Sequence, residues 1–334
     1  MGIVTADEET GQNGDIADGN QKELPIQTGG LSHLRTSCRF EGSAPLQAEA
    51  KSRARADEVE WLSRGRKMGV DVYILNFLAH CRHQYGPFGR TFLLGRQGIH
   101  VWPDNRPSAD EIVRKHGIGQ SLAEASGRQY YAEKLLRSFG ATEVVSGDAS
   151  AYEGATFVHD FNNPLPEEIK DQYDTVFDGG SLEHIFNVPI ALTNLMKLTR
   201  VGGHLLTVNA ANNMLGHGFY QFSPDLFFRV FSTENGFETL THCFADQSGR
   251  PNLREAIDPG MVRKRVELSS TEYCTYLMFA ARKTREVEPF RFWPQQSDYQ
   301  LAWGGDRIWR FLRDTSRRYP TLTQYIRGAL GRVR

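Results

Sequence analysis

The stretch that decides the fold is Tyr173-Asp174-Thr175-Val176-Phe177-Asp178-Gly179-Gly180-Ser181-Leu182-Glu183-His184. Its first half is a short apolar strand that ends in Asp178 and two glycines. This pattern is typical of a buried strand that runs into a tight turn. Residues 143–148 and 156–160 have the same form, and each also ends on an aspartate. Segments with helical spacing separate these strands, and a further strand follows at 204–209. The alternation predicts an α/β fold with a doubly wound, mostly parallel sheet.

Four parts are expected along the chain. Residues 1–55 are polar and aperiodic, which predicts a disordered leader. An N-terminal helical segment is expected over 56–87 and the sheet domain over 88–285, where apolar strands at 237–245 and 273–280 would form an edge hairpin. Residues 286–334 form a basic extension whose apolar spacing predicts two amphipathic helices, broken at Pro320.

The acids that end three predicted strands would meet at one place. In a doubly wound sheet the ligand lies outside the carboxyl ends of the strands, at the point where the strand order reverses. Asp148, Asp160 and Asp178 would all reach that edge. Asp148 follows the second strand, where an acid can accept hydrogen bonds from the ribose hydroxyls of a nucleotide cofactor. The alternative is that each acid only caps the next turn or helix.

The same segments, together with Arg200-Val201-Gly202-Gly203-His204-Leu205-Leu206, resemble the class I S-adenosylmethionine-dependent methyltransferases over about residues 88 to 283. The resemblance implies a Rossmann-like methyltransferase fold and S-adenosyl-L-methionine as the cofactor. It also implies that Asp148 holds the ribose and that Asp160 and Phe161 flank the adenine. The loop at Asp178, Gly179 and Gly180 would lie by the methionine moiety.

The expected first glycine loop departs from the family's Gly-x-Gly-x-Gly pattern. Here the segment is Leu94-Gly95-Arg96-Gln97-Gly98, and about thirty further residues precede the next helix. Gly95 and Arg96 are predicted to line the cofactor site. Arg96 would pair either with the methionine carboxylate, as a charge-assisted fork, or with one of the strand-end acids.

A second polar loop follows the fifth strand, between Asn209 and Ser223. Such a loop would bring the acceptor to the cofactor's methyl group, since rigid strands position the loops that carry function. Asn212 and Asn213, with Glu183, are predicted to bind substrate. His184 and His217 are candidates for a general base, because imidazole titrates near neutrality, and Tyr220 completes the predicted catalytic set. Alternatively, these residues are ordinary turn formers and satisfied structural histidines.

No metal site is predicted. The four cysteines, at 38, 81, 243 and 274, show no zinc-binding spacing, and neither do the histidines and acids at 159, 160, 183 and 184.

The overall charge limits the partners of the chain. Lys plus Arg total 39 and Asp plus Glu total 40, so the chain has no strong nucleic-acid signal. Residues 303–334 nevertheless hold eight Arg and two Asp. We expect this extension to dock on the sheet domain, and peripheral contact with an anionic membrane is the alternative. The sequence shows no secretory signal and no apolar run of roughly 18 residues, which predicts a cytoplasmic protein.

The sequence therefore favours an enzyme that transfers a methyl group to an oxygen or nitrogen of a small-molecule or glycan-like acceptor. A non-catalytic, methyltransferase-like binding protein that has lost cofactor affinity is the first alternative, because the glycine loop is degenerate. A nicotinamide-dependent oxidoreductase is the second, and the absence of a Gly-x-Gly-x-x-Gly motif after the first strand weakens it.

Overall fold

The structure is a computed structural model that describes residues 69–170, 172–249, 251–267, 272–291 and 293–300. The predicted leader lies outside the described residues. So do residues 56–68 of the predicted helical segment and residues 301–334 of the predicted extension. None of the described helices combines the length and apolar character that crossing a bilayer requires.

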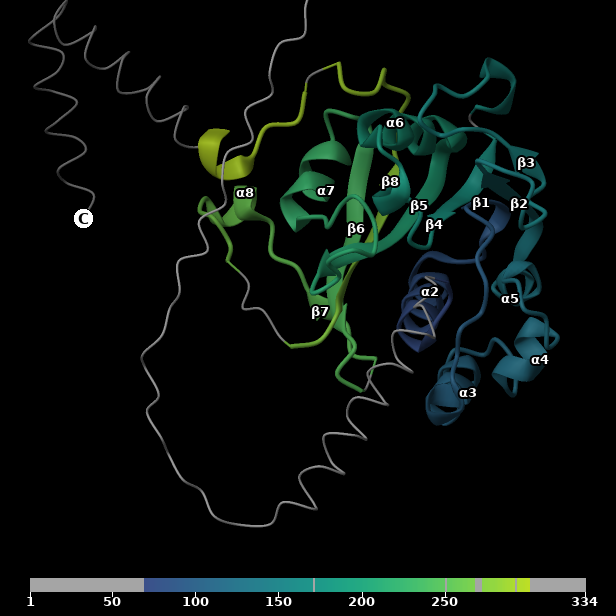
Figure 1. Cartoon of the computed structure of the whole chain (residues 1–334). Helices are drawn as coiled ribbons and strands as arrows, with labels where there is room; N and C mark the ends of the chain where they lie inside the picture. The colour runs from purple at the N-terminus through teal and green to yellow at the C-terminus, as the bar shows by residue number, and fades with distance from the viewer. Residues whose placement is uncertain (1–68, 171, 250, 268–271, 292, 301–334) are drawn as a thin grey trace, which may run out of the picture. The chain divides into compact units, whose positions relative to one another are not determined.

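The described residues form an eight-stranded sheet in the order β3-β2-β1-β4-β5-β8-β6-β7, which Figure 1 shows. The first five strands in this order are parallel, and β8 runs antiparallel to both β5 and β6. The strands are β1 (Gly89–Leu94), β2 (Ala141–Asp148), β3 (Phe157–Val158), β4 (Tyr173–Asp178), β5 (Thr199–Asn212), β6 (Phe237–Asp246), β7 (Arg254–Glu255) and β8 (Thr275–Lys283). The predicted fold class, a doubly wound, mostly parallel, Rossmann-like sheet, is confirmed.

The predicted hairpin strands, β6 and β8, pair antiparallel at one side of the sheet. Within this hairpin β8 is the interior strand, because it also pairs with β5 along eight residue pairs. Residues 275–281 are all buried, as expected for a strand that is covered on both faces. The short strand β7 pairs with β6 only at Cys243 and Phe244.

Helices cover both faces of the sheet. They are α2 (Val72–Tyr85), α3 (Arg106–Lys115), α4 (Leu122–Ser126), α5 (Glu133–Ser138), α6 (Val188–Leu198), α7 (Pro224–Val230) and α8 (Pro259–Val262), with short 3-10 turns η1 (Pro103–Asn105), η2 (Glu167–Ile169) and η3 (Leu182–His184). The apolar side chains of α2 to α5 share one buried cluster with one face of the sheet, and those of α6 and α7 share a second cluster with the other face.

Successive side chains of a strand point to opposite faces of the sheet, so one sheet contributes residues to both clusters. Leu206 of β5 joins the cluster under α2, and its neighbour Leu205 joins the cluster under α6. Helix α2 begins where the Asp71 carboxylate accepts hydrogen bonds from the backbone of Tyr73 and Ile74, both at 2.9 Å. The described part of the predicted N-terminal segment thus packs into the same core as the sheet.

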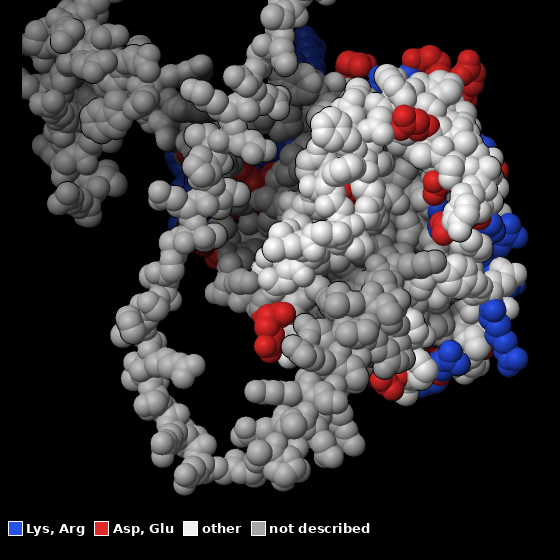
Figure 2. Space-filling model, viewed as in Figure 1, with Lys and Arg blue, Asp and Glu red and all other residues white. Residues whose placement is uncertain are grey.

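Charged side chains lie mostly at the margins of the face turned to the viewer in Figure 2. Asp and Glu gather along its upper margin, Lys and Arg lie mainly toward the right, and the white surface between them holds few charged side chains. The described residues on this face therefore form no continuous band of Lys and Arg of the kind that follows a nucleic-acid backbone.

Candidate functional site

The carboxyl ends of β1, β2 and β4 surround a cavity of about 290 Å³. The parallel register places Leu94 level with both Gly147 and Asp178, so the three strands end together. The cavity is lined by Gly95, Arg96, Gln97, Gly98, His100, Tyr130, Asp148, Glu153, Gly180, Ser181 and His184. Five residues predicted from the sequence thus line one hollow at the predicted edge of the sheet: Gly95, Arg96, Asp148, Gly180 and His184.

Asp148 is one of two acidic residues that line this cavity, and Glu153 is the other. It is the last residue of β2, and its Oδ1 accepts a hydrogen bond from the backbone N–H of Ser150 at 3.3 Å. The donor is only two residues away in the chain, and Asp148 lines the cavity. The group is therefore placed to accept hydrogen bonds from a bound ligand.

The glycine loop packs against the loop that follows β4. Gly95 has a φ of +71°, and a Cβ at this position would lie 2.4 Å from Ser181 Oγ. Ser181 Oγ donates to Leu94 O at 2.9 Å, and Gln97 Nε2 donates to Ser181 Oγ at 3.1 Å. Glycine is required at 95 because Ser181 approaches so closely. Gln97 was not predicted to line the site, although it lies inside the Gly95–Gly98 segment.

Within the protein, Arg96 pairs with groups other than the strand-end acids. Its Nε donates to Glu133 Oε1 at 2.7 Å, and its Nη1 donates to Glu153 O at 2.6 Å. The guanidinium carbon lies 3.9 Å from the centroid of the Tyr131 ring. The alternative in which Arg96 pairs with a strand-end acid is wrong, since the first turn of α5 supplies Glu133 instead. The pairing with the methionine carboxylate stays a prediction. The local sequence gave no signal for a partner thirty-seven residues away.

Asp178 lies beneath the cavity, fully buried. Its Oδ1 accepts from Ser181 N at 2.8 Å, which shapes the turn at Gly179 and Gly180. Its Oδ2 accepts from Asn209 Nδ2 at 2.6 Å. Burial raises the pKa of Asp178. Asp178 is a support for the loop, and neither it nor Gly179 lines the cavity.

Glu183, which was predicted to bind substrate, is also fully buried, and this role stays a prediction. Its Oε2 accepts from Asn209 Nδ2 at 3.0 Å and its Oε1 from Ala210 N at 3.3 Å. Burial, and then the neighbouring Asp178 carboxylate, raise the pKa of Glu183. Two acids thus share a single amide donor between β4 and β5.

Asp160 and Phe161 do not reach the cavity. The Asp160 carboxylate accepts hydrogen bonds from Asn162 N at 3.0 Å and Asn162 Nδ2 at 2.8 Å, and these bonds lower its pKa. Phe161 is 3% exposed, and its ring packs against Phe92 and Phe157. The structure places the Asp160 carboxylate in a turn and the Phe161 ring in the core, and their place beside an adenine stays a prediction.

The predicted catalytic residues come from two loops that lie together. The rings of His184, in η3, and His217, after β5, are 5.1 Å apart between centroids. Burial lowers the pKa of His184. Tyr220 Oη donates to Phe186 O at 2.9 Å, and its ring stacks on Phe222. The Tyr220 hydroxyl therefore links these loops in the structure, and its catalytic role stays a prediction.

Asn212 and Asn213 lie farther along β5. Asp178 is in register with Thr207, five residues before Asn212, which corresponds to about 16 Å of strand. Asn213 has a φ of +55°, and its Nδ2 donates to Tyr273 O at 2.9 Å. These two residues do not line the cavity, and Asn213 fastens the end of β5 to the start of β8.

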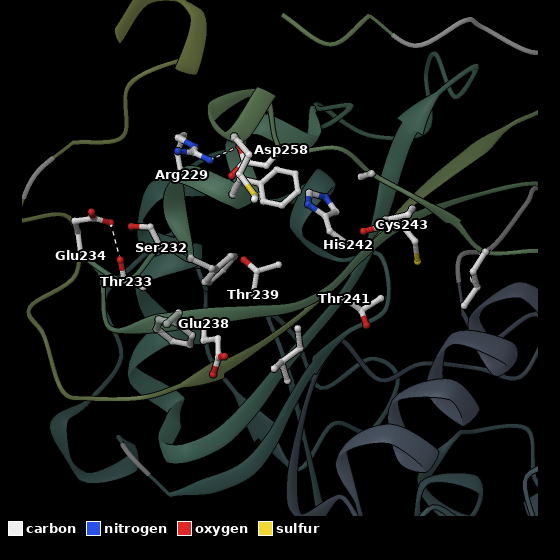
Figure 3. A pocket seen from close by; sticks show the side chains of 18 of the residues that line it. Arg229, Ser232, Thr233, Glu234, Glu238, Thr239, Thr241, His242, Cys243 and Asp258 are labelled. Carbon is white, nitrogen blue, oxygen red and sulfur yellow. Dashed lines mark hydrogen bonds and ion pairs between the residues drawn. The ribbon is translucent and has the colours of Figure 1, made fainter. Parts of the chain in front are cut away.

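A larger cavity, of about 850 Å³, lies along β6, and Figure 3 shows it. Arg229 and Asp258 are joined across its rim, with Arg229 Nη2 2.5 Å from Asp258 Oδ1. His242 lines it and is only 4% exposed, and neither of its ring nitrogens has a hydrogen-bond partner among the described residues. None of the residues predicted from the sequence lines this cavity.

The residues that line the smaller cavity can hold a nucleoside, although the glycine loop departs from the family's sequence pattern. It offers a carboxylate at the end of the second strand and glycine backbone at 95 and 180. Its volume is close to the lower end of the range of roughly 300 to 1,000 Å³ that is usual for small-molecule sites. The residues present therefore fit the ribose end of the cofactor that the resemblance implies.

No protein-family model matches the sequence, and no curated protein does. Several solved structures have a similar fold. The 1,6-didemethyltoxoflavin-N1-methyltransferase of Burkholderia thailandensis, solved with S-adenosylhomocysteine, is 12% identical, with a TM-score of 0.35, over 74% of this chain and 94% of its own. TehB from Haemophilus influenzae is 14% identical, with a TM-score of 0.33, over 62% and 61%. A 16S rRNA adenine methyltransferase of Catenulisporales acidiphilia is 12% identical, with a TM-score of 0.32, over 64% and 94%.

Proposed function

We propose that the chain is an S-adenosylmethionine-dependent methyltransferase that acts on an oxygen or nitrogen of a small-molecule or glycan-like acceptor. One observation supports this function most. Asp148 and the loop that Asp178 shapes, at Gly180 and Ser181, meet in one cavity at the carboxyl ends of parallel strands. A doubly wound sheet binds nucleotide cofactors at this place.

Each wall of the cavity has a part in this proposal. Asp148 would accept hydrogen bonds from the ribose hydroxyls, and the backbone at Gly95 and Gly180 would pass close to the rest of the cofactor. When bound, the cofactor supplies a methyl group on a positively charged sulfur. The acceptor would enter beside His184, which lines the cavity. The chain would then contribute chiefly by holding the acceptor in line with the methyl group.

A specific observation supports the alternative of a binding protein without catalysis. Ser181 and Gln97 lie close around Gly95, in the loop that lacks the glycine spacing of the resembling family. A chain with such a changed loop could keep the fold and lose the activity, because fold alone does not establish function.

Replacement of Asp148 tests the proposal. Asp148→Ala removes the acceptor of the ribose hydrogen bonds, so we expect the affinity for S-adenosylhomocysteine to fall roughly 10- to 150-fold in calorimetric titration. Asp160→Ala is the matched control, since Asp160 also follows a strand but lies in a turn outside the cavity. Equal affinity in the wild type and a folded Asp148→Ala variant would contradict the assignment of this cavity.

A further inference from the structure

Three possible metal ligands converge where the loop after β4 meets the loop after β5. Glu183, His184 and His217 each offer one ligand atom, and these atoms all lie within 4.8 Å of one another. The sequence predicted no metal site because the first two ligands are adjacent and the third follows thirty-three residues later. Chain folding, rather than local spacing, brings them together.

Backbone contacts hold the two loops in this position. Phe219 N donates to Glu183 O at 2.8 Å, and Tyr220 N donates to the same oxygen at 3.3 Å. A Cβ on Gly218 would lie 2.7 Å from Glu183 O, so only glycine allows the loop that carries His217 to come this close. His217 N itself donates to Met214 O at 3.0 Å. The three ligands are therefore parts of one braced structure.

The charge around this cluster is unbalanced. Asp178 and Glu183 are both fully buried, and both receive a hydrogen bond from Asn209. Among the described residues, no Lys or Arg forms an ion pair with either carboxyl group. Burying an ionised carboxylate without a cation is costly. A bound cation would offset this cost.

We propose that Glu183, His184 and His217 bind a divalent transition-metal ion, and that the ion's open positions receive a hydroxyl group of the acceptor. Two imidazole nitrogens and one carboxylate oxygen suit Zn²⁺ and its neighbours better than Mg²⁺ or Ca²⁺, which prefer oxygen ligands alone. The inference rests on the proposed function, because His184 also lines the cofactor cavity. It narrows the acceptor from an oxygen or nitrogen compound to a hydroxyl compound.

In this proposal the imidazoles hold the ion and do not themselves take the acceptor's proton. A divalent ion lowers the pKa of a bound hydroxyl, so that its proton passes to water. The acceptor oxygen then forms the new bond to the methyl carbon. The bond between that carbon and sulfur breaks with its electron pair left on sulfur, and the positive sulfonium becomes a neutral thioether. Atoms and charge balance without any further reactant.

Zinc binding by the full chain, freed of any histidine tag, tests the proposal. We expect calorimetric titration with Zn²⁺ to show one tight site per chain. His217→Ala and His184→Ala should each weaken it at least 10-fold, because each removes one of three ligands. His184 is partly exposed at the surface, so its replacement should leave the fold intact, and thermal unfolding of both variants checks this. His159→Ala, outside the cluster, is the matched control and should bind zinc like the wild type.

The titrations separate this inference from the proposed function. Titration of His217→Ala with S-adenosylhomocysteine should give wild-type affinity, because Asp148 and the strand ends are unchanged. Absence of a zinc site in the wild type, or equal zinc affinity in the His184→Ala, His217→Ala and His159→Ala variants, would overturn the metal site even if S-adenosylhomocysteine binds. If zinc binds as expected and S-adenosylhomocysteine does not, the metal site stands and the proposed function fails.

Discussion

The side-chain amide of Asn209 donates to the carboxyl group of Asp178 over 2.6 Å and so ties β5 to the carboxyl end of β4. The same Nδ2 donates to Glu183 Oε2 at 3.0 Å. All three residues are fully buried. Asn209 therefore supports both the loop that borders the cofactor cavity and the Glu183 carboxyl group that we propose binds a metal ion.

Replacing Asn209 should destabilise the fold strongly. Asn209→Leu leaves two buried carboxyl groups without their shared donor, and we expect a loss of about 2 to 4 kcal/mol in the free energy of unfolding, measured in urea. Thr207→Val is the control on the same strand, because Thr207 Oγ1 is buried and has no hydrogen-bond partner among the described residues. This control should be neutral or stabilising. A loss as large in Thr207→Val as in Asn209→Leu would show that any change to this strand has the same effect.

The sheet could be predicted because its strands have strong local signals. Apolar runs such as Thr175–Phe177 end in an acid and glycines, and the helices between them have clear spacing. The interior place of β8 could not be predicted in the same way. Strand order depends on which edges pair after the chain has folded back, and the sequence of β8 shows only that both of its faces are apolar.

The place of Asp148 at the cavity could be predicted because this acid lies directly at the end of a strand. The direction of a side chain could not be predicted where a single residue's position in a turn decides it. Phe161 follows Asp160 by one residue, yet its ring faces the core. The convergence of Glu183 with His217 was also missed, because it depends on the contact between two loops that are far apart in sequence.

Phe161→Ala distinguishes a core residue from a wall of a cofactor site. The ring is 3% exposed and contacts two other phenylalanines, so its removal should cost about 3 to 5 kcal/mol of unfolding free energy. Phe186→Ala, at a position that is 70% exposed, should cost far less. We expect the folded fraction of Phe161→Ala to keep its affinity for S-adenosylhomocysteine. A stable variant with reduced affinity for S-adenosylhomocysteine would show that Phe161 belongs to the cofactor site.

His242 should make the fold sensitive to acid. Burial lowers the pKa of His242 from 6.5 to about 3. Between these two pH values the side chain is protonated in the unfolded chain and neutral in the folded chain. The stability that depends on a neutral His242 is therefore fully present above pH 6.5. It is lost progressively as the pH falls from 6.5 toward 3, and the free energy of unfolding decreases by the same amount. Between pH 7 and pH 5 this amounts to about 2 kcal/mol. His242→Leu should lose that much less stability than the wild type over this interval, as measured by urea unfolding at each pH. Parallel pH dependence in the two proteins would refute the prediction.

Calorimetric titration of the wild-type chain with S-adenosylhomocysteine tests most directly whether the cavity at the ends of β1, β2 and β4 binds this class of cofactor. We expect one site per chain with a dissociation constant in the micromolar range, and no binding of NAD⁺ in a parallel titration. Absence of any heat of binding at millimolar S-adenosylhomocysteine would contradict the account and favour a binding protein that has kept only the fold.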